Sequence, residues 1–553
     1  MAASRVWWVF AFLFILGILV VLLVVLLRRD ARCQGGFQHG AVAADSGVCS
    51  NIGRDILKQG GSAVDGAIAA LLCLSVMNPQ SMGLGGGVIF TIYNASTGQV
   101  EIINARERAP SNDPSDLVKH CAAGTFTKSG VKWIGIPGEL RGNQAAHQRY
   151  GRLPWKTLFE PTIKLITEGV KISVLLSTYL QYPQVKIPLK KQLSVVSGRG
   201  QTLNFTQLGH TLRTIAEKGA DVFYKGEIAQ QMLEDLNAQG SKLTLDEFSN
   251  YKVQTVKAMN ISLGNTVLYT APPPAGGALL SFILNILEGY NFSENSLRDK
   301  TERIETYHRI AEALKFANGQ KHQLNNISSS KEIKEVTESL LSKSFAAKIR
   351  QLIDGSGNHS LSYYQVNLMY PETSGTTHVS VISKDGSSVS VTSSINHILG
   401  SMVYSPRTGI IFNNQMADFC TGDPHRAIKE GERPPSSMTP SILISKDKKF
   451  QLVIGGSGGS FITSATALAI MNKLWFGTNL TEAISLPVLY VNSENKLAFE
   501  SSFDKVVKTG LQERGHQSYD SPYFFNVVQG VSQEGSCLFA HSDQRKGGIA
   551  AGY

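Results

Sequence analysis

The sequence predicts a mixed α/β (α+β) protein behind one membrane-spanning helix, and three patterns support this. An unbroken apolar run of 22 residues covers positions 6–27. Helical apolar spacing dominates from residue 138 to about 287, for example in 157–168 and 226–237. Short β-type segments frame that region, and the clearest is a hairpin in which 379–383 and 388–392 flank Asp385-Gly386. The 553 residues allow roughly two to four domains.

The amino-terminal apolar run has the length of a transmembrane helix. As a helix, 22 residues extend about 33 Å, which matches the hydrocarbon core of a bilayer. The run ends in Arg28-Arg29-Asp30 rather than in a small-residue cleavage site, which favours an uncleaved signal anchor over a cleaved signal peptide. We therefore expect a short tail at 1–5 and an anchor at 6–27.

Two signals disagree about the orientation of this anchor. Arg5 precedes the run and three arginines follow it by residue 32, so the positive-inside rule places the carboxyl side in the cytoplasm. Seven Asn-x-Ser/Thr sequons favour the opposite orientation, because such sites matter only on the lumenal side. The candidate glycosylation sites are Asn94, Asn204, Asn260, Asn291, Asn326, Asn358 and Asn479. We expect a single-pass type II protein with its body outside the cell.

Charge and cysteine content exclude several classes of protein. The net charge of +10 is scattered, and no nucleic-acid motif accompanies it, so we expect no nucleic-acid partner. No CxxC or HExxH pattern occurs, and we expect no metal. Six cysteines follow the anchor. Cys49 and Cys73 bracket a predicted helix pair and could form a disulfide, whereas the sequence does not decide the state of the other four.

A Gly375-Thr376 junction directly precedes the predicted hairpin. If this bond is cut, Thr376 becomes an N-terminal residue whose own amine can act as general base for its hydroxyl. A Gly-Thr-Thr run is also a common way to begin a strand, so the junction alone does not establish this chemistry.

Other polar groups recur where predicted strands end. Arg106 closes a strand shortly before Pro110, where it could bind a carboxylate or form a surface ion pair. The glycine-rich run 455–460 leads into a predicted helix. Since no Lys follows the glycines, the run fits an oxyanion hole better than a phosphate-binding loop. This layout suits one site built over a sheet.

Taken together, these runs resemble the gamma-glutamyltransferase family (glutathione hydrolases) over essentially the whole chain. The matching stretches are 61–65, 81–87, 104–107, 434–438 and Gly458-Gly459. Residues 81–94 and 402–409 are most similar to the gamma-glutamyl leukotrienase branch, gamma-glutamyltransferase 5. The resemblance implies an N-terminal-nucleophile hydrolase with an αββα sandwich. It also implies a precursor that cuts itself before Thr376 into a large subunit, 28–375, and a small catalytic subunit, 376–553, which stay together as a heterodimer.

The resemblance also assigns roles within the site. Thr376 would attack a γ-glutamyl amide, Ser394 would steady its hydroxyl, and the N–H groups of Gly458 and Gly459 would hold the oxyanion. The remaining polar residues would bind the α-carboxylate and the α-ammonium group of the substrate. They are Arg106, Ser436 and Ser437 for the carboxylate, and Asn396, Gln415 and Asp418 for the ammonium. The resemblance implies no cofactor.

The implied substrates are glutathione and its S-conjugates, such as leukotriene C4, which would give leukotriene D4. Water or an amino acid or peptide acceptor would resolve the acyl-enzyme. Ser394 stands where the family usually has Thr, Gln415 stands where Glu is usual, and the unusual Arg108 suggests a preference for more anionic conjugates. The alternative is a non-catalytic membrane glycoprotein that retains the fold.

Overall fold

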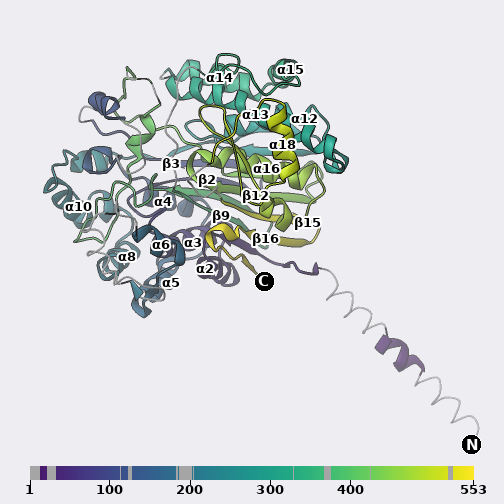
Figure 1. Ribbon diagram of the computed structural model, residues 1–553. Helices are drawn as coiled ribbons and strands as arrows, with labels where there is room; N and C mark the ends of the chain where they lie inside the picture. The colour runs from purple at the N-terminus through teal and green to yellow at the C-terminus, as the bar shows by residue number, and fades with distance from the viewer. Residues whose placement is uncertain are drawn as a thin grey trace, which may run out of the picture.

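Two stacked antiparallel β-sheets with helices on both outer faces form the body of the protein (Figure 1). The computed structural model describes residues 13–20, 33–111, 114–121, 128–181, 185, 202–203, 205–327, 329–366, 375–421, 423, 425–520 and 527–553. This four-layer arrangement is the αββα sandwich that the resemblance implies.

The first sheet has seven strands, and Thr376 lies immediately before one of its central strands. In spatial order it contains β17 (Ala551–Gly552), β1 (Ala41–Ala44), β9 (Thr377–Ile382), β10 (Ser388–Ser394), β2 (Gly87–Asn94), β3 (Gln99–Ala105) and β6 (Gln254–Lys257). The predicted hairpin is confirmed as β9 and β10, with Thr377 opposite Ser393. Gly386 provides the positive φ, 81°, that the connecting turn requires.

The second sheet has six strands and supplies the glycine-rich part of the site. Its order is β16 (Cys537–Ser542), β15 (Val527–Glu534), β12 (Phe450–Ser457), β11 (Ser441–Ser445), β8 (Thr266–Thr270) and β7 (Met259–Leu263). Ala41 and Ile382 from the first sheet pack with Val453 and Val531 from the second in one buried cluster. Burial of apolar surface between the sheets therefore fixes how β9 lies over β12.

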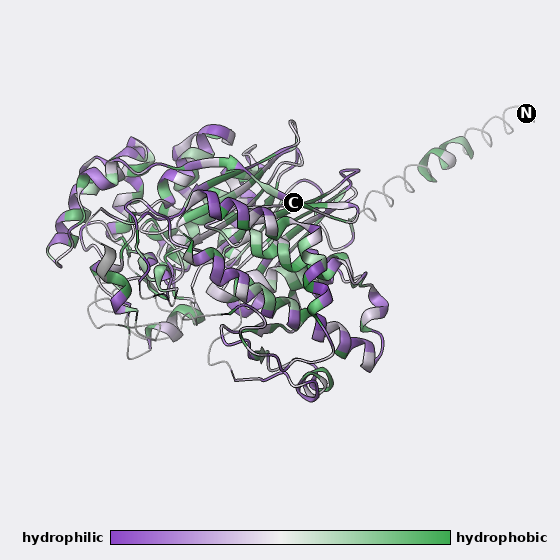
Figure 2. Cartoon of the chain, turned by 90° about the horizontal axis from the view of Figure 1, so that it is seen from above, coloured by the Kyte–Doolittle hydropathy of each residue, from purple (hydrophilic) through white to green (hydrophobic). Residues whose placement is uncertain are grey.

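Each sheet is covered by its own helical layer. The seven-stranded sheet packs against α2 (Gly47–Lys58), α3 (Ala63–Met77), α4 (Glu139–Tyr150), α5 (Trp155–Glu168), α6 (Val174–Leu180), α8 (Thr206–Lys218), α9 (Asp221–Tyr224), α10 (Glu227–Asn237) and α11 (Leu245–Ser249). The six-stranded sheet packs against α12 (Gly277–Glu288), α13 (Lys300–Asn326), α14 (Ser330–Leu341), α15 (Lys343–Leu352), α16 (Ile462–Leu474), α17 (Leu480–Ser485) and α18 (Lys505–Glu513). Figure 2 shows hydrophobic residues gathered toward the centre and polar residues on the periphery.

Local sequence signals explain several element boundaries. Ser62 begins α3 with a capping box, in which its hydroxyl accepts from the Asp65 N–H while the Asp65 carboxylate accepts from the Ser62 N–H. Short elements complete the fold: η2 (Pro114–His120), η4 (Val131–Trp133), η5 (Glu294–Leu297), η6 (Gln415–Phe419), η7 (Gly459–Phe461), η8 (Gln544–Lys546), and the two-stranded pairs β4 (Val170–Lys171) with β5 (Thr202–Leu203) and β13 (Leu489–Val491) with β14 (Leu497–Phe499).

One expectation about local structure was incomplete. The region 138–287 contains the predicted helices, among them α5, α10 and α12, but it also contains three strands. Of these, β6 and β8 pair with β3 and β11, which are distant in the sequence, and β7 forms a hairpin with β8.

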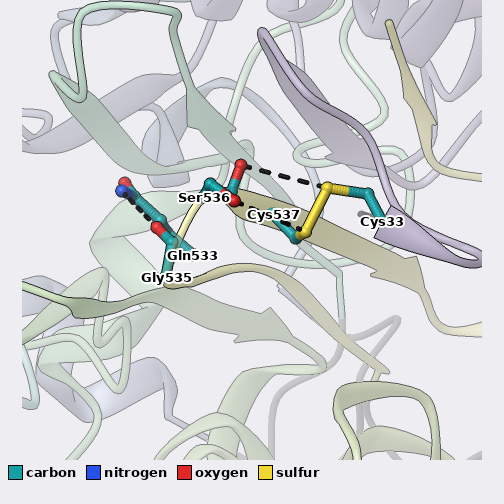
Figure 3. Close-up of a disulfide and its surroundings, with 5 residues drawn as sticks. All are labelled: Cys33, Gln533, Gly535, Ser536 and Cys537. Atoms are coloured by element: carbon teal, nitrogen blue, oxygen red, sulfur yellow. Dashed lines mark hydrogen bonds between the residues drawn. A yellow bond between two sulfur atoms is a disulfide. The ribbon is translucent and has the colours of Figure 1, made fainter. Parts of the chain in front are cut away.

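All six cysteines form disulfides. Cys49–Cys73 confirms the predicted pair, and the other two bonds are Cys33–Cys537 (Figure 3) and Cys121–Cys420. The partners in these last two bonds lie on opposite sides of Thr376 in the sequence.

The predicted anchor falls mostly outside the described residues, which include only 13–20 of the run 6–27. Within the part of the chain that the structure describes, no helix is long and apolar enough to cross a membrane. Among the sequons, Asn260, Asn291, Asn358 and Asn479 are exposed and Asn94 is half-buried. Asn204 and the side chain of Asn326 lie outside the described residues, and the use of all seven sites stays a prediction.

Candidate active site

Thr376 lies immediately before β9 with its hydroxyl directed at the end of the neighbouring strand. The Thr376 Oγ1 atom is 3.0 Å from Ser394 Oγ, and Thr376 is only 4% exposed. The Asn396 N–H donates to Ser394 Oγ over 2.8 Å. Ser394 can then donate its own proton to Thr376, so the serine that replaces the family's threonine still orients the hydroxyl.

The Gly375–Thr376 peptide, still intact here, has an unusual backbone. Thr376 has a φ of 79°, which is disfavoured for a β-branched residue. A Cβ atom on Gly375 would lie 1.9 Å from the Asn396 carbonyl oxygen, so only glycine fits at this position. The Gly458 N–H donates to the Gly375 carbonyl oxygen over 3.1 Å. One predicted oxyanion-hole donor therefore already polarises the carbonyl that self-cleavage would attack.

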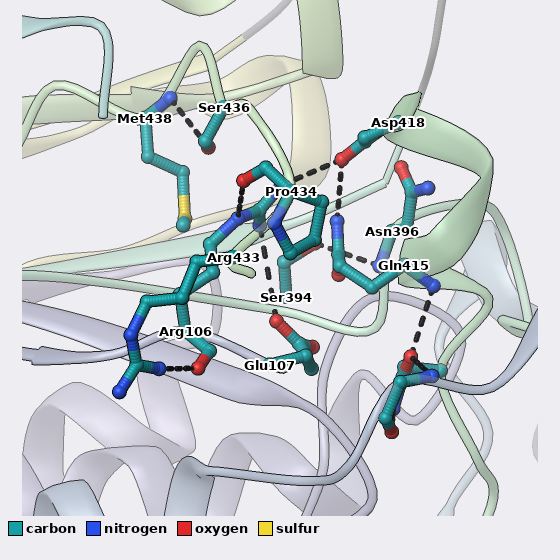
Figure 4. A network of polar contacts seen from close by, with 12 residues as sticks. Arg106, Glu107, Ser394, Asn396, Gln415, Asp418, Arg433, Pro434, Ser436 and Met438 are labelled. Carbon is teal, nitrogen blue, oxygen red and sulfur yellow. Dashed lines mark hydrogen bonds and ion pairs between the residues drawn. The ribbon is translucent and has the colours of Figure 1, made fainter. Parts of the chain in front are cut away.

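Arg106 lies within a dense network of polar contacts at the site (Figure 4). It is 1% exposed, and its guanidinium donates to the carbonyl oxygens of Pro434 at 3.0 Å and Pro435 at 2.7 Å. It also donates to Asp418 Oδ2 over 2.6 Å. Ser436 and Ser437 follow the two prolines into the same cavity. This preorganised cation suits a carboxylate ligand.

Asp418 joins the cationic wall to the predicted ammonium site. Its Oδ2 atom also accepts from Gln415 Nε2 over 2.7 Å. The Gln415 amide oxygen is buried and has no hydrogen-bond partner among the described residues. It could accept a bond from a ligand ammonium. Asn396, whose amide donates to the Asn414 carbonyl over 3.2 Å, completes this side of the cavity.

Two buried carboxyl groups lie behind the site. Burial raises the pKa of Glu107 to about 7, although the nearby Arg106 opposes this shift. Burial also raises the pKa of Glu139 to about 8, and Glu139 Oε2 accepts from the Ser393 hydroxyl over 2.7 Å. Because Ser393 precedes Ser394, Glu139 supports the strand end that orients Thr376.

The structure gathers nine of the ten predicted site residues around one cavity of about 610 Å³, including its open mouth. The nine are Thr376, Ser394, Gly459, Arg106, Asn396, Gln415, Asp418, Ser436 and Ser437. The tenth, Gly458, contributes the N–H bond to Gly375 described above. The catalytic and binding roles of these residues stay predictions. The structure shows that the residues lie close together, as the resemblance implies.

Sequence reasoning missed several residues of the cavity wall. Lys321 and Asn325 enter from α13, and Cys420 and Thr421 follow η6. No local pattern marks Lys321, which lies 55 positions before Thr376. Arg108 does not line the cavity, because its guanidinium donates to the carbonyl oxygens of Gly431 and Asn250. The suggested role of Arg108 in binding anionic conjugates therefore loses its basis, whereas Lys321 is a second cationic side chain, besides Arg106, that lines the cavity.

One group of possible metal ligands occurs among the described residues, outside this cavity. His308, Glu312 and His516 are buried together. The Lys315 ammonium donates to Glu312 over 3.1 Å, and the two imidazoles contact each other at 2.8 Å. A neighbouring ammonium disfavours a bound cation, so the group is better explained as a buried hydrogen-bond network.

Comparison with known proteins agrees with this geometry. The profile of the gamma-glutamyltranspeptidase family matches residues 49–553. The glutathione hydrolase 5 proenzyme of Homo sapiens is 48% identical over 564 residues, covering 97% of this chain and 96% of that protein. That of Rattus norvegicus is also 48% identical, with the same coverage.

Solved structures support the same assignment. A cephalosporin acylase from Bacillus halodurans matches with a TM-score of 0.82 and 25% identity, covering 94% of this chain and 96% of that chain. A gamma-glutamyltranspeptidase from Pseudomonas nitroreducens, complexed with L-DON, matches with a TM-score of 0.52 and 26% identity, covering 59% and 97%. With the profile match over most of its length and relatives at 48% identity, the chain belongs to the gamma-glutamyltranspeptidase family.

Proposed function

We propose that this enzyme cleaves γ-glutamyl amide bonds through an acyl-enzyme on Thr376. The observation that carries the proposal is the 3.0 Å contact between Thr376 Oγ1 and Ser394 Oγ in a cavity that also holds the Arg106–Asp418 pair. A γ-glutamyl group presents a carboxylate and an ammonium on one carbon, and this pair offers one partner to each.

The reaction uses the free amine that self-cleavage would give Thr376. The amine takes the proton of the Thr376 hydroxyl as Oγ1 attacks the γ-carbonyl carbon. The tetrahedral oxyanion is held by the N–H groups of Gly458 and Gly459, an arrangement worth about 3–4 kcal/mol per donor. The C–N bond then breaks, and the amine returns the proton to the leaving nitrogen. Water, or the amino group of an amino acid or peptide, attacks the resulting ester and releases Thr376.

Maturation would use the same atoms. The Thr376 hydroxyl attacks the Gly375 carbonyl, whose oxygen accepts the Gly458 N–H bond. The Gly375–Thr376 C–N bond then breaks as the hydroxyl proton passes to the Thr376 nitrogen, and water hydrolyses the resulting ester. The products are a large subunit ending at Gly375 and a small subunit of residues 376–553.

Glutathione and its S-conjugates, leukotriene C4 among them, are the substrates we propose. The name of the human relative at 48% identity supports glutathione. Conjugates with apolar substituents are supported by a crevice of about 370 Å³ that shares Lys321 and Ser460 with the site. Its apolar wall includes Leu279, Ile283 and Leu314. Lys321 suits the glycine carboxylate of the leaving group, and the crevice suits the S-substituent.

We further propose that the body of the protein is extracellular, anchored at the plasma membrane by residues 6–27. Exposed sequons and the pairing of all six cysteines support this location, because disulfides persist in oxidising compartments. The charge distribution around the anchor argues against it.

The test is expression of the full chain in a glycosylating host, followed by amino-terminal sequencing and hydrolysis assays. We expect a fragment that begins at Thr376 and release of glutamate from glutathione, with kcat/KM rising along a series of S-alkyl glutathiones. The variant Ala317→Phe, which narrows the crevice, should flatten that series while glutathione hydrolysis continues. An intact, inactive chain would favour the non-catalytic glycoprotein.

A further inference from the structure

A largely buried lysine near the carboxyl terminus contacts the backbone of the nucleophile. Lys546, at the end of η8, donates from Nζ to the Thr376 carbonyl oxygen over 2.7 Å. The same ammonium donates to Ser457 Oγ at 2.7 Å and to Asp45 Oδ2 at 3.1 Å. Its three protons are thus all used, and the side chain is 14% exposed. Ser457 directly precedes Gly458, so Lys546 ties the nucleophile to the oxyanion-hole segment.

Asp45 holds this lysine in place. It follows β1, its side chain is fully buried, and Oδ2 also accepts from the Thr377 hydroxyl over 2.7 Å. The other oxygen, Oδ1, accepts from Gln529 Nε2 over 2.6 Å. The Asp45–Lys546 pair therefore joins four strands, β1 and β9 from one sheet and β12 and β15 from the other, at the point where Thr376 precedes β9.

We infer that Lys546 is a positioning residue that fixes the main chain of Thr376 and whose charge favours the unprotonated form of the Thr376 α-amine. This rests on the proposed function. Within one residue, the nitrogen and the carbonyl oxygen are at most about 3.6 Å apart, so Nζ lies within about 6 Å of the Thr376 nitrogen. A positive charge at that distance disfavours protonation of an amine. An ordinary α-amine has a pKa of about 7.7–8.0 and would be largely protonated at neutral pH, which would remove the general base.

The other charges that face Thr376 do not replace this effect. Arg106 and Asp418 form an ion pair with each other. His378 on β9 is neutral, because burial lowers its pKa to about 3. The carboxylate of Asp45 contacts Thr377 rather than Thr376, so the ammonium is the nearer charge. Other charged or titratable groups around the site, among the described residues, include Glu107, Glu139, Lys128, Lys321 and Arg433, and none of them has a hydrogen bond to Thr376.

The test is the pH dependence of kcat/KM for a γ-glutamyl anilide with the full-length enzyme and two variants at position 546. Lys546→Met keeps the length of the side chain but removes its charge. The acid limb, the pH at which kcat/KM falls on the acidic side of the profile, should therefore move upward by about one pH unit. Lys546→Arg keeps the charge and should leave the limb within about 0.3 unit of wild type. Asp45→Asn leaves the lysine uncompensated and should move the limb downward.

Lys473→Met is the matched control, since Lys473 is 11% exposed and also paired, 2.9 Å from Glu534. Its acid limb should not move. The inference is overturned if Lys546→Met lowers kcat with an unmoved limb, or if the limb of Asp45→Asn coincides with that of wild type. If Lys546→Met fails to mature, the comparison of Asp45→Asn with wild type tests the inference by itself. Wild-type enzyme without γ-glutamyl activity would instead contradict the proposed function.

The disulfides carry a second, independent inference. Cys33–Cys537 and Cys121–Cys420 each connect a residue before Gly375 to a residue after Thr376. We propose that the mature subunits are joined covalently by both bonds. Cys420 also lines the cavity, directly after η6, so the second bond holds the segment that contains Asp418.

This is tested by denaturing electrophoresis of cleaved, alkylated enzyme with and without reductant. We expect one band of about full-chain mass without reductant and two bands with it. Cys33→Ser and Cys121→Ser should each remain linked, whereas the double variant should separate without reductant. Separation of the cleaved wild type without reductant overturns the proposal. A single band under both conditions instead shows that the chain was never cut.

Discussion

Substitution of Asp418 by Asn tests the recognition of the γ-glutamyl group most directly. Asp418 is the only acidic side chain among the described residues that line the cavity, since Gln415 carries no charge. A hydrogen bond to a charged group contributes about 1.5–3 kcal/mol. Loss of one such bond to the substrate ammonium should lower kcat/KM by about 10- to 150-fold. Asparagine keeps the shape of the side chain and one acceptor oxygen, so the fall measures charge more than packing.

The assay compares glutathione with an analogue in which a glutaryl group replaces the γ-glutamyl group and the ammonium is absent. The wild type should strongly prefer glutathione, and D418N should lose most of that preference. The ratio of the four kcat/KM values gives the coupling between Asp418 and the ammonium. Because Asp418 also accepts from Arg106, some loss on both substrates is expected. An equal loss on both substrates, with no change in preference, would refute the assignment of Asp418 to the ammonium.

Three further predictions concern the nucleophile and its support. Thr376→Ala should leave one uncut chain without γ-glutamyl hydrolysis, because both reactions need the hydroxyl; a band that splits on reduction would contradict this. Ser394→Ala should lower kcat about 10-fold or more and slow self-cleavage, whereas Ser394→Thr should restore both, since only the hydroxyl contacts Thr376 Oγ1. Glu139→Gln should gain thermal stability relative to wild type between pH 5 and pH 8. In the folded protein Glu139 keeps its proton up to about pH 8, whereas in the unfolded chain its pKa is the ordinary 4.5. As pH rises through this window, the wild type therefore loses up to about 4 kcal/mol of folding stability that the glutamine variant does not lose. Melting temperatures that fall in parallel in both proteins would refute it.

The sequence predicted the parts of the fold that local signals encode. The hairpin turn at Gly386 and the helices at 157–168 and 226–237 occur where their local patterns predict them. The strands β6 and β8 were missed because their partners, β3 and β11, lie about 150 to 180 positions away in the sequence. Pairing at such distances depends on tertiary contacts rather than on local propensity.

The site, like the fold, has residues that could be predicted from the sequence and residues that could not. Residues beside recognisable runs, such as Arg106 and Gly458, could be predicted because the runs themselves resemble a known family. Lys546 and Asp45 could not, because they are 501 positions apart and each has an ordinary neighbourhood. The pairing of β17 with β1, and of β1 with β9, helps to bring the carboxyl-terminal segment that carries Lys546 next to Thr376.

In the structure the Gly375–Thr376 bond is intact, yet the predicted site residues already lie together. The proposed cleavage would therefore need to rearrange few contacts around Thr376. The Thr376 hydroxyl contacts Ser394, and the Gly458 N–H bond polarises the Gly375 carbonyl before any bond is broken. The Thr376 nitrogen is an amide that donates to the Ser81 carbonyl over 3.2 Å. The proposed cleavage would turn this nitrogen into an amine and would free the Gly458 N–H for the substrate's carbonyl oxygen. If Lys546 holds the Thr376 backbone throughout, maturation adds a general base to a nucleophile that is already in position.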